Sequence, residues 1–267
     1  MGRARAFVVL ALAGALAVTG VAHEASACSC VGPQLGLTVP VPATDAPLLT
    51  RVRIALPDPA RAGVNGAVVL RKHGGATVAT TTRTFADGRW VATVEIVPTA
   101  PLAPDTTYEV AVVEPDAHPS TTVVTGFTTG KALDTTAPQL DALGAATVHR
   151  NARAMSSMCQ TAGPWVTIEG VDAHDPSRPD ASLVFGVWLA DANGVIDAKK
   201  PPTALRTAHQ RMLVIGQQSI CDPYSFPFPR GGVVWLGVAA IDESGNTSAM
   251  RRVRIDLGAP TAAQAHP

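Results

Sequence analysis

Residues 102–110 read Leu-Ala-Pro-Asp-Thr-Thr-Tyr-Glu-Val, and this stretch decides the fold that we expect for the chain. It has the form Leu-x-Pro-x-Thr-x-Tyr of a tyrosine corner, a turn that joins two strands of a β-sandwich. Leu102 is expected to fill the core at the turn, and Pro104 to stiffen the turn. Tyr108 then begins the next strand, where its hydroxyl hydrogen-bonds to the backbone of the corner.

Short apolar runs separated by turn residues lie on both sides of this corner. Arg51–Ile54 and Trp90–Ile96 alternate between apolar and other residues, which is typical of a strand with one buried face. Asp87-Gly88 between two runs indicates a hairpin, because Gly tolerates positive φ. The strands predicted for this half are Leu37–Val41, Arg51–Leu56, Ala67–Arg71, Thr77–Thr84, Trp90–Pro98, Thr107–Val113 and Thr121–Thr128.

Residues 98–130 resemble the end of bacterial immunoglobulin-like domains of the surface-layer type, and more loosely fibronectin type III domains. Residues 234–256 resemble the last hairpin of such domains more weakly, through an alternating strand that ends in Ala-x-Asp and is followed by Gly-Asn-x-Ser. The usual opening of the family is poorly matched at residues 54–57. The resemblance implies a structural or binding module.

The second half has the same strand-rich pattern but no tyrosine corner. Residues 203–208 fit either one helical turn or a loop. The predicted strands are Gln139–Ala142, Trp165–Val171, Ser182–Leu189, Met212–Ile215, Val233–Ile241 and Ala249–Ile255. We therefore expect an all-β protein with two tandem immunoglobulin-like β-sandwich domains after a signal peptide. The expected divisions are a signal peptide (1–27), a Cys-x-Cys segment (28–35), the first sandwich (36–130), a linker (131–138), the second sandwich (139–257) and a disordered tail (258–267).

The first residues have the three parts of a secretory signal peptide. Arg3 and Arg5 precede an apolar stretch over residues 7–21, and the small residues 25–27 supply a cleavage site. No later stretch is long enough to span a membrane after cleavage. We expect an exported protein that is periplasmic, anchored in the outer membrane or extracellular.

An even number of cysteines in an exported chain indicates disulfides. We favour a Cys159–Cys221 bridge, although four cysteines allow three pairings. Cys28 directly follows the predicted cut, so it is a candidate for lipidation, which would leave Cys30 free. The alternatives are a strained Cys28–Cys30 ring and bridges from this pair to the two distal cysteines. The Cys28-Ser29-Cys30 start also resembles that of tissue inhibitors of metalloproteinases, but the further cysteines of that family are missing.

Few residues of the chain are candidates for catalysis or metal binding. The chain has 21 basic and 21 acidic residues, and this balance argues against a nucleic-acid binder. No zinc, P-loop, dinucleotide or nucleophile-elbow motif occurs, so we expect no cofactor and no enzyme activity. Candidate metal ligands are Asp172 and Asp175, beside His174, and Asp242 in the 242–246 turn. A solvated loop and ordinary turn chemistry are the favoured interpretations of these two segments.

Aromatic residues make up only 4% of the chain, so their grouping on one loop is informative. Tyr224, Phe226 and Phe228 lie in a Pro-rich loop, and they either form an exposed binding patch or fold inward. Three tryptophans occur in apolar runs, where core packing is favoured over sugar stacking; they are Trp165, Trp188 and Trp235.

Three classes of function remain. The leading hypothesis is a non-enzymatic cell-envelope or secreted protein that acts in adhesion, scaffolding or partner binding, with an unknown protein or polysaccharide as its partner. The first alternative is a carbohydrate-binding module. The second is a protease inhibitor or an accessory protein of an enzyme.

Overall fold

The computed structural model describes residues 36–39, 44–57, 68–85, 91–113, 121–150, 163–216 and 226–259. Every regular element within these ranges is a β-strand. None of the residues so described belongs to a helix with the length and hydropathy that a membrane crossing requires. The predicted signal peptide, all four cysteines and Tyr224 lie outside these ranges.

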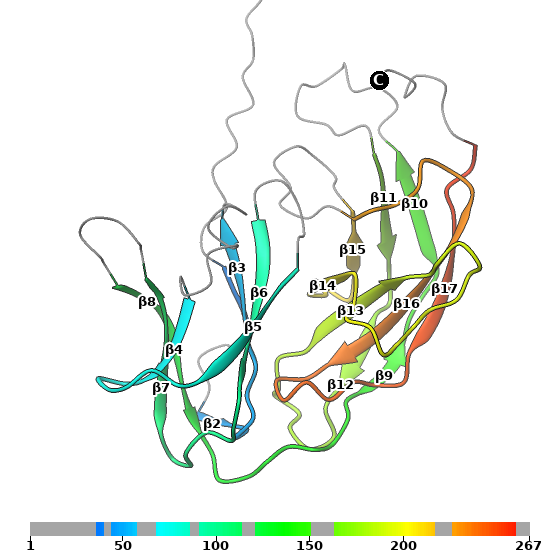
Figure 1. Cartoon of the computed structure of the whole chain (residues 1–267). Coiled ribbons are helices and arrows are strands. Elements are labelled where there is room, and N and C mark those ends of the chain that lie inside the picture. Colours follow the sequence, from blue (N-terminus) through cyan, green and yellow to red (C-terminus); the bar gives the residue numbers. More distant parts are fainter. Residues whose placement is uncertain are drawn as a thin grey trace, which may run out of the picture.

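The described residues between 36 and 129 form a sandwich of two four-stranded sheets (Figure 1). One sheet has the order β1-β3-β6-β5 and the other the order β2-β8-β7-β4. This is the strand order of an immunoglobulin-like sandwich, with strands A, B, E and D in one sheet and C, F and G in the other. Strand β2 runs parallel to β8, as an addition to the second sheet. The bounds are β1 (Gly36–Val39), β2 (Thr44–Ala46), β3 (Val52–Pro57), β4 (Val68–Lys72), β5 (Thr80–Phe85), β6 (Val91–Pro98), β7 (Thr107–Val113) and β8 (Thr121–Thr129).

The core of this first sandwich lies between its two sheets. Successive side chains of a strand lie on opposite faces, so the core residues alternate with residues that face away. Arg53, between two core residues of β3, therefore lies on the outer face of its sheet. The core residues include Val52, Ile54, Val94 and Ile96 from one sheet and Leu70, Val110 and Phe127 from the other.

The tyrosine corner joins β6 to β7 with the geometry that its motif implies. Leu102 and Tyr108 are both buried in the core. The backbone N–H of Ala103 donates to the hydroxyl of Tyr108 over 2.9 Å. The ring of Tyr108 stacks on Phe127, with 5.8 Å between the ring centroids. Thr129 closes the turn, because its hydroxyl donates to the carbonyl of Ala103 at 2.6 Å.

Replacing Tyr108 with phenylalanine is expected to lower the free energy of unfolding by about 1–3 kcal/mol. The substitution keeps the ring in the core but leaves the N–H of Ala103 without its partner. Urea denaturation followed by circular dichroism measures the loss. Thr107→Val is the matched control, because the hydroxyl of Thr107 bonds only to that of Thr128 at an exposed position. An equal loss in the two variants would contradict the prediction.

The described residues between 139 and 256 form a second sandwich. The four-stranded sheet β14-β13-β16-β17 packs on the three-stranded sheet β10-β11-β15, and β9 and β12 form a separate two-stranded sheet. The bounds are β9 (Gln139–Ala142), β10 (Ala146–Arg150), β11 (Pro164–Ile168), β12 (Asp172–His174), β13 (Val184–Leu189), β14 (Ala204–Arg206), β15 (Leu213–Ile215), β16 (Val233–Ile241) and β17 (Arg251–Asp256). The core between the sheets includes Val166, Ile168, Phe185, Val187, Leu213, Ile215, Leu236, Val238 and Ile255.

The two sandwiches lie side by side, and the segment between β8 and β9 connects them at the bottom of the view in Figure 1. A separate apolar cluster joins them, which we call the junction cluster. It contains Phe85, from the end of β5, together with residues of the four-stranded sheet of the second sandwich. The latter alternate with the core residues of the same strands, so they lie on the outer face of that sheet. The junction cluster consists of Phe85, Val184, Trp188, Leu205, Ala239 and Ile241.

The all-β fold class is confirmed. The predicted strands correspond to observed strands. Residues 203–208 were expected to be a helical turn or a loop, but they contain the strand β14. No strand was predicted at β2, β10 or β12, which have three to five residues each. Strand β3 differs from its prediction in a more informative way, because the junction buries the outer face as well as the inner one. Arg53, on that outer face, is 0% exposed.

Candidate functional site

The β16–β17 turn, residues 242–246, lies at the centre of the junction. Its backbone closes through the N–H of Asp242, which donates to the carbonyl of Asn246 at 3.1 Å. Gly245 adopts a φ of 87°, in the left-handed region that favours glycine. The carboxylate of Asp242 accepts from the backbone N–H and the side-chain amide of Asn246, both at 2.8 Å. Turn chemistry, as predicted for this segment, therefore accounts for part of the bonding of Asp242.

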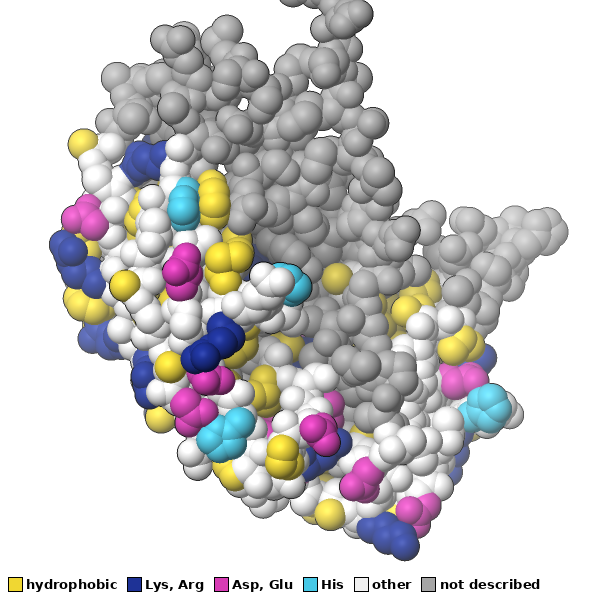
Figure 2. Space-filling model, turned by 180° about the vertical axis from the view of Figure 1, so that it is seen from behind, with side chains coloured by type: hydrophobic (Ala, Val, Ile, Leu, Met, Phe, Trp, Pro, Cys, Tyr) yellow, Lys and Arg dark blue, Asp and Glu magenta, His cyan; other side chains and the backbone are white. Residues whose placement is uncertain are grey.

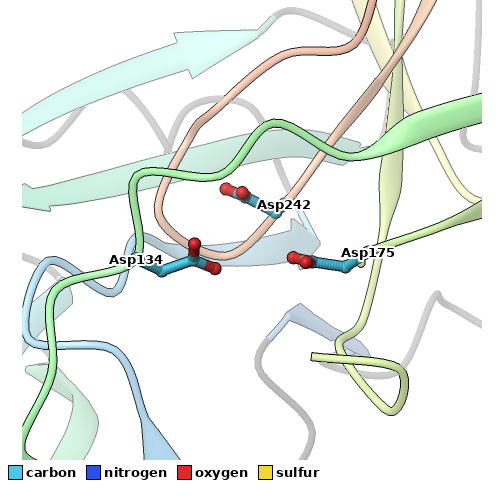
Figure 3. A group of neighbouring side chains, drawn as sticks. All are labelled: Asp134, Asp175 and Asp242. Carbon is cyan, nitrogen blue, oxygen red and sulfur yellow. The ribbon is translucent and has the colours of Figure 1, made fainter. Parts of the chain in front are cut away.

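Three carboxylates from separate segments meet beside this turn. They belong to Asp134 in the segment between the sandwiches, Asp175 after β12, and Asp242. One oxygen from each lies within 4.8 Å of the others, and Figure 3 shows the three side chains pointing toward one another. At that separation, two ionised carboxylates repel by about 3 kcal/mol in an effective dielectric of about 20. The cluster therefore stores electrostatic repulsion that a cation would relieve.

Asp175 is as deeply buried as Asp242 in this carboxylate cluster, and each is 1% exposed. Its Oδ1 accepts from the backbone N–H of Ser177 at 2.8 Å, the hydroxyl of Ser177 at 2.7 Å and the N–H of Arg178 at 3.1 Å. Its Oδ2 is fully buried and has no hydrogen-bond partner in the part of the chain that the structure describes. A buried carboxylate oxygen without a partner is costly, so it calls for a ligand.

The other two members are held by local contacts. Asp134 Oδ1 accepts from the N–H of Thr136 at 3.0 Å and from the hydroxyl of Ser177 at 3.2 Å. The side-chain amide of Asn246 donates to the backbone carbonyl of Asp134 at 3.1 Å. Burial raises the pKa of the Asp242 carboxyl; the hydrogen bonds from Asn246 oppose this rise, and the charge of Asp134 adds to it.

The same turn also holds the first sandwich through its backbone. The guanidinium of Arg53 donates from Nη1 to the carbonyl of Asp242 at 3.0 Å and from Nε to Glu95 at 2.9 Å. The N–H of Arg51 donates to the carbonyl of Glu243 at 2.7 Å. Burial lowers the pKa of Arg53, and the charge of Glu95 opposes that shift. The five-residue turn thus has two roles. The side chain of Asp242 belongs to the carboxylate cluster, and the carbonyls of Asp242 and Glu243 bind the first sandwich.

Asp175 and Asp242 were named as candidate metal ligands, although a solvated loop and turn chemistry were the favoured interpretations, and the structure brings them together. The solvated-loop interpretation is wrong for Asp175, which is buried. The third candidate, Asp172, lies elsewhere and pairs with Arg211 at 3.0 Å on the surface. His174 pairs with Asp141 at 2.6 Å and is not part of the cluster. Asp134 was missed because it was interpreted as part of a linker. Its only sequence signal is an Asp directly before two threonines in a short polar segment that ends in Pro138.

The structure shows where the two described phenylalanines of the predicted aromatic patch lie. Phe226 is 9% exposed and belongs to the core of the second sandwich. Phe228 packs on it with 4.6 Å between ring centroids. The inward-folding alternative therefore applies to Phe226, and an exposed patch centred on it is wrong.

The three tryptophans named from the sequence differ in their surroundings. Trp188 is buried in the junction cluster. Trp165 is partly buried and stacks on His149, with 3.9 Å between the ring centroids. Trp235 is partly buried and lines a surface pocket of about 380 Å³ between the 189–194 and 227–234 segments.

Comparisons with known proteins give only distant similarity. No family model matches the chain, and no curated protein does. Among solved structures, the fibronectin(III)-like modules of Clostridium thermocellum CbhA are 12% identical, with 88% of this chain and 98% of that chain covered and a TM-score of 0.26. The N-terminal Ig1-2 module of the Drosophila receptor protein tyrosine phosphatase DLAR is 10% identical, with 85% and 100% covered and a TM-score of 0.28.

A pullulanase from Anoxybacillus sp. LM18-11 is 11% identical; 82% of this chain aligns with 25% of that enzyme, with a TM-score of 0.24. The TM-scores of these matches are low, so the strand order of the sandwiches remains the basis of the fold class. By that order the chain is an all-β protein of immunoglobulin-like β-sandwiches.

Proposed function

We propose that this chain is an exported, non-enzymatic protein of the cell envelope or the extracellular space that presents two immunoglobulin-like domains to a partner as one rigid unit. The partner is a protein or a polysaccharide. The proposal rests on analogy with other sandwich modules for its general class, because a fold alone does not define a function.

The face-to-face contact of the two sandwiches is the observation that carries the proposal. The contact combines the junction cluster with the buried Arg53–Glu95 pair and two hydrogen bonds to the 242–246 turn. Domains joined only by a flexible linker move independently, whereas apolar packing and buried hydrogen bonds between domains restrict their relative motion. A fixed orientation is what a scaffold needs to hold a partner at a defined geometry.

The surface chemistry is compatible with this role. On the described part of the face in Figure 2, lysines and arginines are interspersed with acidic and hydrophobic side chains. Several ionisable groups named from the sequence also have structural partners, such as Asp172 with Arg211. This mixed surface favours a protein or polysaccharide partner over a nucleic acid, because proteins that bind nucleic acids have a continuous basic patch or stripe.

Spin-label distances test the rigid unit directly. Labels on encoded non-natural residues at Lys72 and Val195, both exposed and one on each sandwich, avoid the native cysteines. We expect one narrow distance distribution between the two labels. A broad distribution would show independent sandwiches and would remove the basis of the scaffold proposal. Expression of the full chain in a bacterial host, with sequencing of the mature N-terminus, tests export separately.

A carbohydrate-binding role is the second candidate, and the pocket at Trp235 favours it. Arg252 lies over the indole with its guanidinium 4.8 Å from the ring centroid, which fixes the orientation of the ring. Pro227, Pro229 and Asp191 line the same pocket. Titration with cell-wall polysaccharides tests this role, with Trp165→Ala as the control for Trp235→Ala. Binding lost only in Trp235→Ala would support it, and no binding to any polysaccharide would reject it.

A further inference from the structure

We propose that Asp134, Asp175 and Asp242 together bind one calcium ion, which fastens the segment between the sandwiches to the second sandwich. This inference does not depend on the scaffold role proposed above. It begins with the geometry of the carboxylate cluster, in which one oxygen from each residue lies within 4.8 Å of the others. Calcium binds oxygens at about 2.3–2.6 Å, so two of its ligands lie at most about 5 Å apart. The three oxygens are therefore close enough together for one ion to bind between them with small side-chain adjustments.

The unpartnered oxygen of Asp175 is a second and independent observation. Asp175 is 1% exposed, and its Oδ2 has no hydrogen-bond partner among the described residues. Figure 3 shows its carboxylate directed at Asp134 and Asp242. A buried carboxylate oxygen without a partner is costly, and a cation bound between the three aspartates would satisfy it.

No direct ion pair offsets the charge of the cluster among the described residues, although Arg53 interacts electrostatically with Asp242. None of the three aspartates forms an ion pair with a described lysine, arginine or histidine. The nearby Arg178 pairs with Glu243 instead. The hydroxyl of Ser177 has one proton but contacts both Asp134 and Asp175. The local hydrogen bonds therefore do not neutralise the negative charge of the three carboxylates, which a bound cation would do.

The donor set selects calcium over other common metals. All three side chains offer hard carboxylate oxygens, which suit calcium and magnesium and not softer metals. Magnesium demands near-ideal octahedral geometry and keeps several waters, so it rarely uses a site made only of protein groups. Calcium accepts the irregular geometry that three separate segments provide.

The ligands come from different segments of the chain, so a bound ion would hold those segments together. Asp134 belongs to the connecting segment, and Asp242 to the turn whose carbonyls bind the first sandwich through Arg53 and Arg51. An ion at the cluster holds this segment against the turn. Calcium therefore stabilises the junction as well as the second sandwich.

Calorimetric titration with CaCl2 tests the site in the full chain, as processed by the host and stripped with EDTA. We expect one calcium per chain and a melting temperature that rises by about 5–10 °C at a calcium concentration 100-fold above the dissociation constant. Asp134→Asn and Asp175→Asn are expected to weaken binding at least about 10-fold, because each removes a charged ligand. Asp172→Asn is the matched control, since Asp172 lies outside the cluster, and it should keep the affinity of the unaltered chain.

Three results would overturn the proposal. One is the absence of any heat or melting shift with CaCl2 up to about 10 mM, beyond the weak limit for extracellular calcium modules. Another is a calcium affinity of Asp134→Asn equal to that of the unaltered chain. If Asp175→Asn fails to fold, Asp134→Asn alone serves as the test, because Asp134 is not in a sandwich core. The third is an equal response to MgCl2, which would exclude a calcium-selective site.

Discussion

Replacing Arg53 with methionine is expected to lower the free energy of unfolding by about 3–5 kcal/mol, because it breaks a buried ion pair from one side. Arg53 is 0% exposed, and its partner Glu95 is 4% exposed. The variant leaves the carboxylate of Glu95 buried and removes the donor to the carbonyl of Asp242. Arg51 and Arg83 lie 3.8 and 4.0 Å from Glu95, but they are partly exposed and give only screened compensation.

Urea denaturation of Arg53→Met measures this loss, with Arg83→Met as the control. Arg83 approaches the same carboxylate from an exposed position, so its removal should cost less than about 1 kcal/mol. The double variant Arg53→Met/Glu95→Met should recover most of the loss, because replacing both charges of a buried pair with apolar groups is often neutral. A loss in Arg53→Met no greater than that in Arg83→Met would show that the junction does not depend on this pair.

Trp188→Ala is expected to cost about 3–5 kcal/mol, as large-to-small changes at buried tryptophans do. Its ring is 6% exposed and packs in the junction cluster with Val184 and Ile241. The indole N–H donates to the carbonyl of Lys200 at 2.8 Å, and that bond is lost with the ring. The packing is tight, because a Cβ added at Gly186 would lie only 2.5 Å from the ring.

The control for Trp188→Ala is Trp165→Ala. Trp165 is only partly buried and stacks on His149 outside the junction, so its loss should be smaller. The spin-label distance between the sandwiches is a second measurement, because only Trp188→Ala should broaden it. Equal losses of stability together with equal distance distributions would refute a role of Trp188 at the junction.

Local sequence signals predicted the strands and the corner, because those features depend on neighbouring residues. Tyr108 lies at its expected position because the spacing Leu-x-Pro-x-Thr-x-Tyr defines one turn. The position of Asp134 depends instead on how two sandwiches pack, and no local pattern reports that. Asp172, three residues before Asp175, was grouped with it by proximity in sequence. Asp172 begins β12 and Asp175 follows its end, and only Asp175 belongs to the carboxylate cluster.

Arg53 shows a second limit of pattern analysis. Alternation in residues 51–54 predicted one buried face, and a charged residue on the other face normally indicates solvent. The second sandwich covers that face instead, and Glu95 and the 242–246 turn supply the partners for the guanidinium. A contact between residues 189 positions apart cannot be predicted from the alternation of neighbouring residues.

The face-to-face contact has a consequence for the two halves as separate molecules. Separation of the halves would remove Phe85 from the junction cluster and leave the cluster residues of the second sandwich more exposed, which favours aggregation. The first sandwich would expose Phe85 together with Arg53 and Glu95, and water solvates the latter two readily. The two halves therefore differ in the surface that they would expose as separate fragments. They are not independent modules that could be combined freely with other domains.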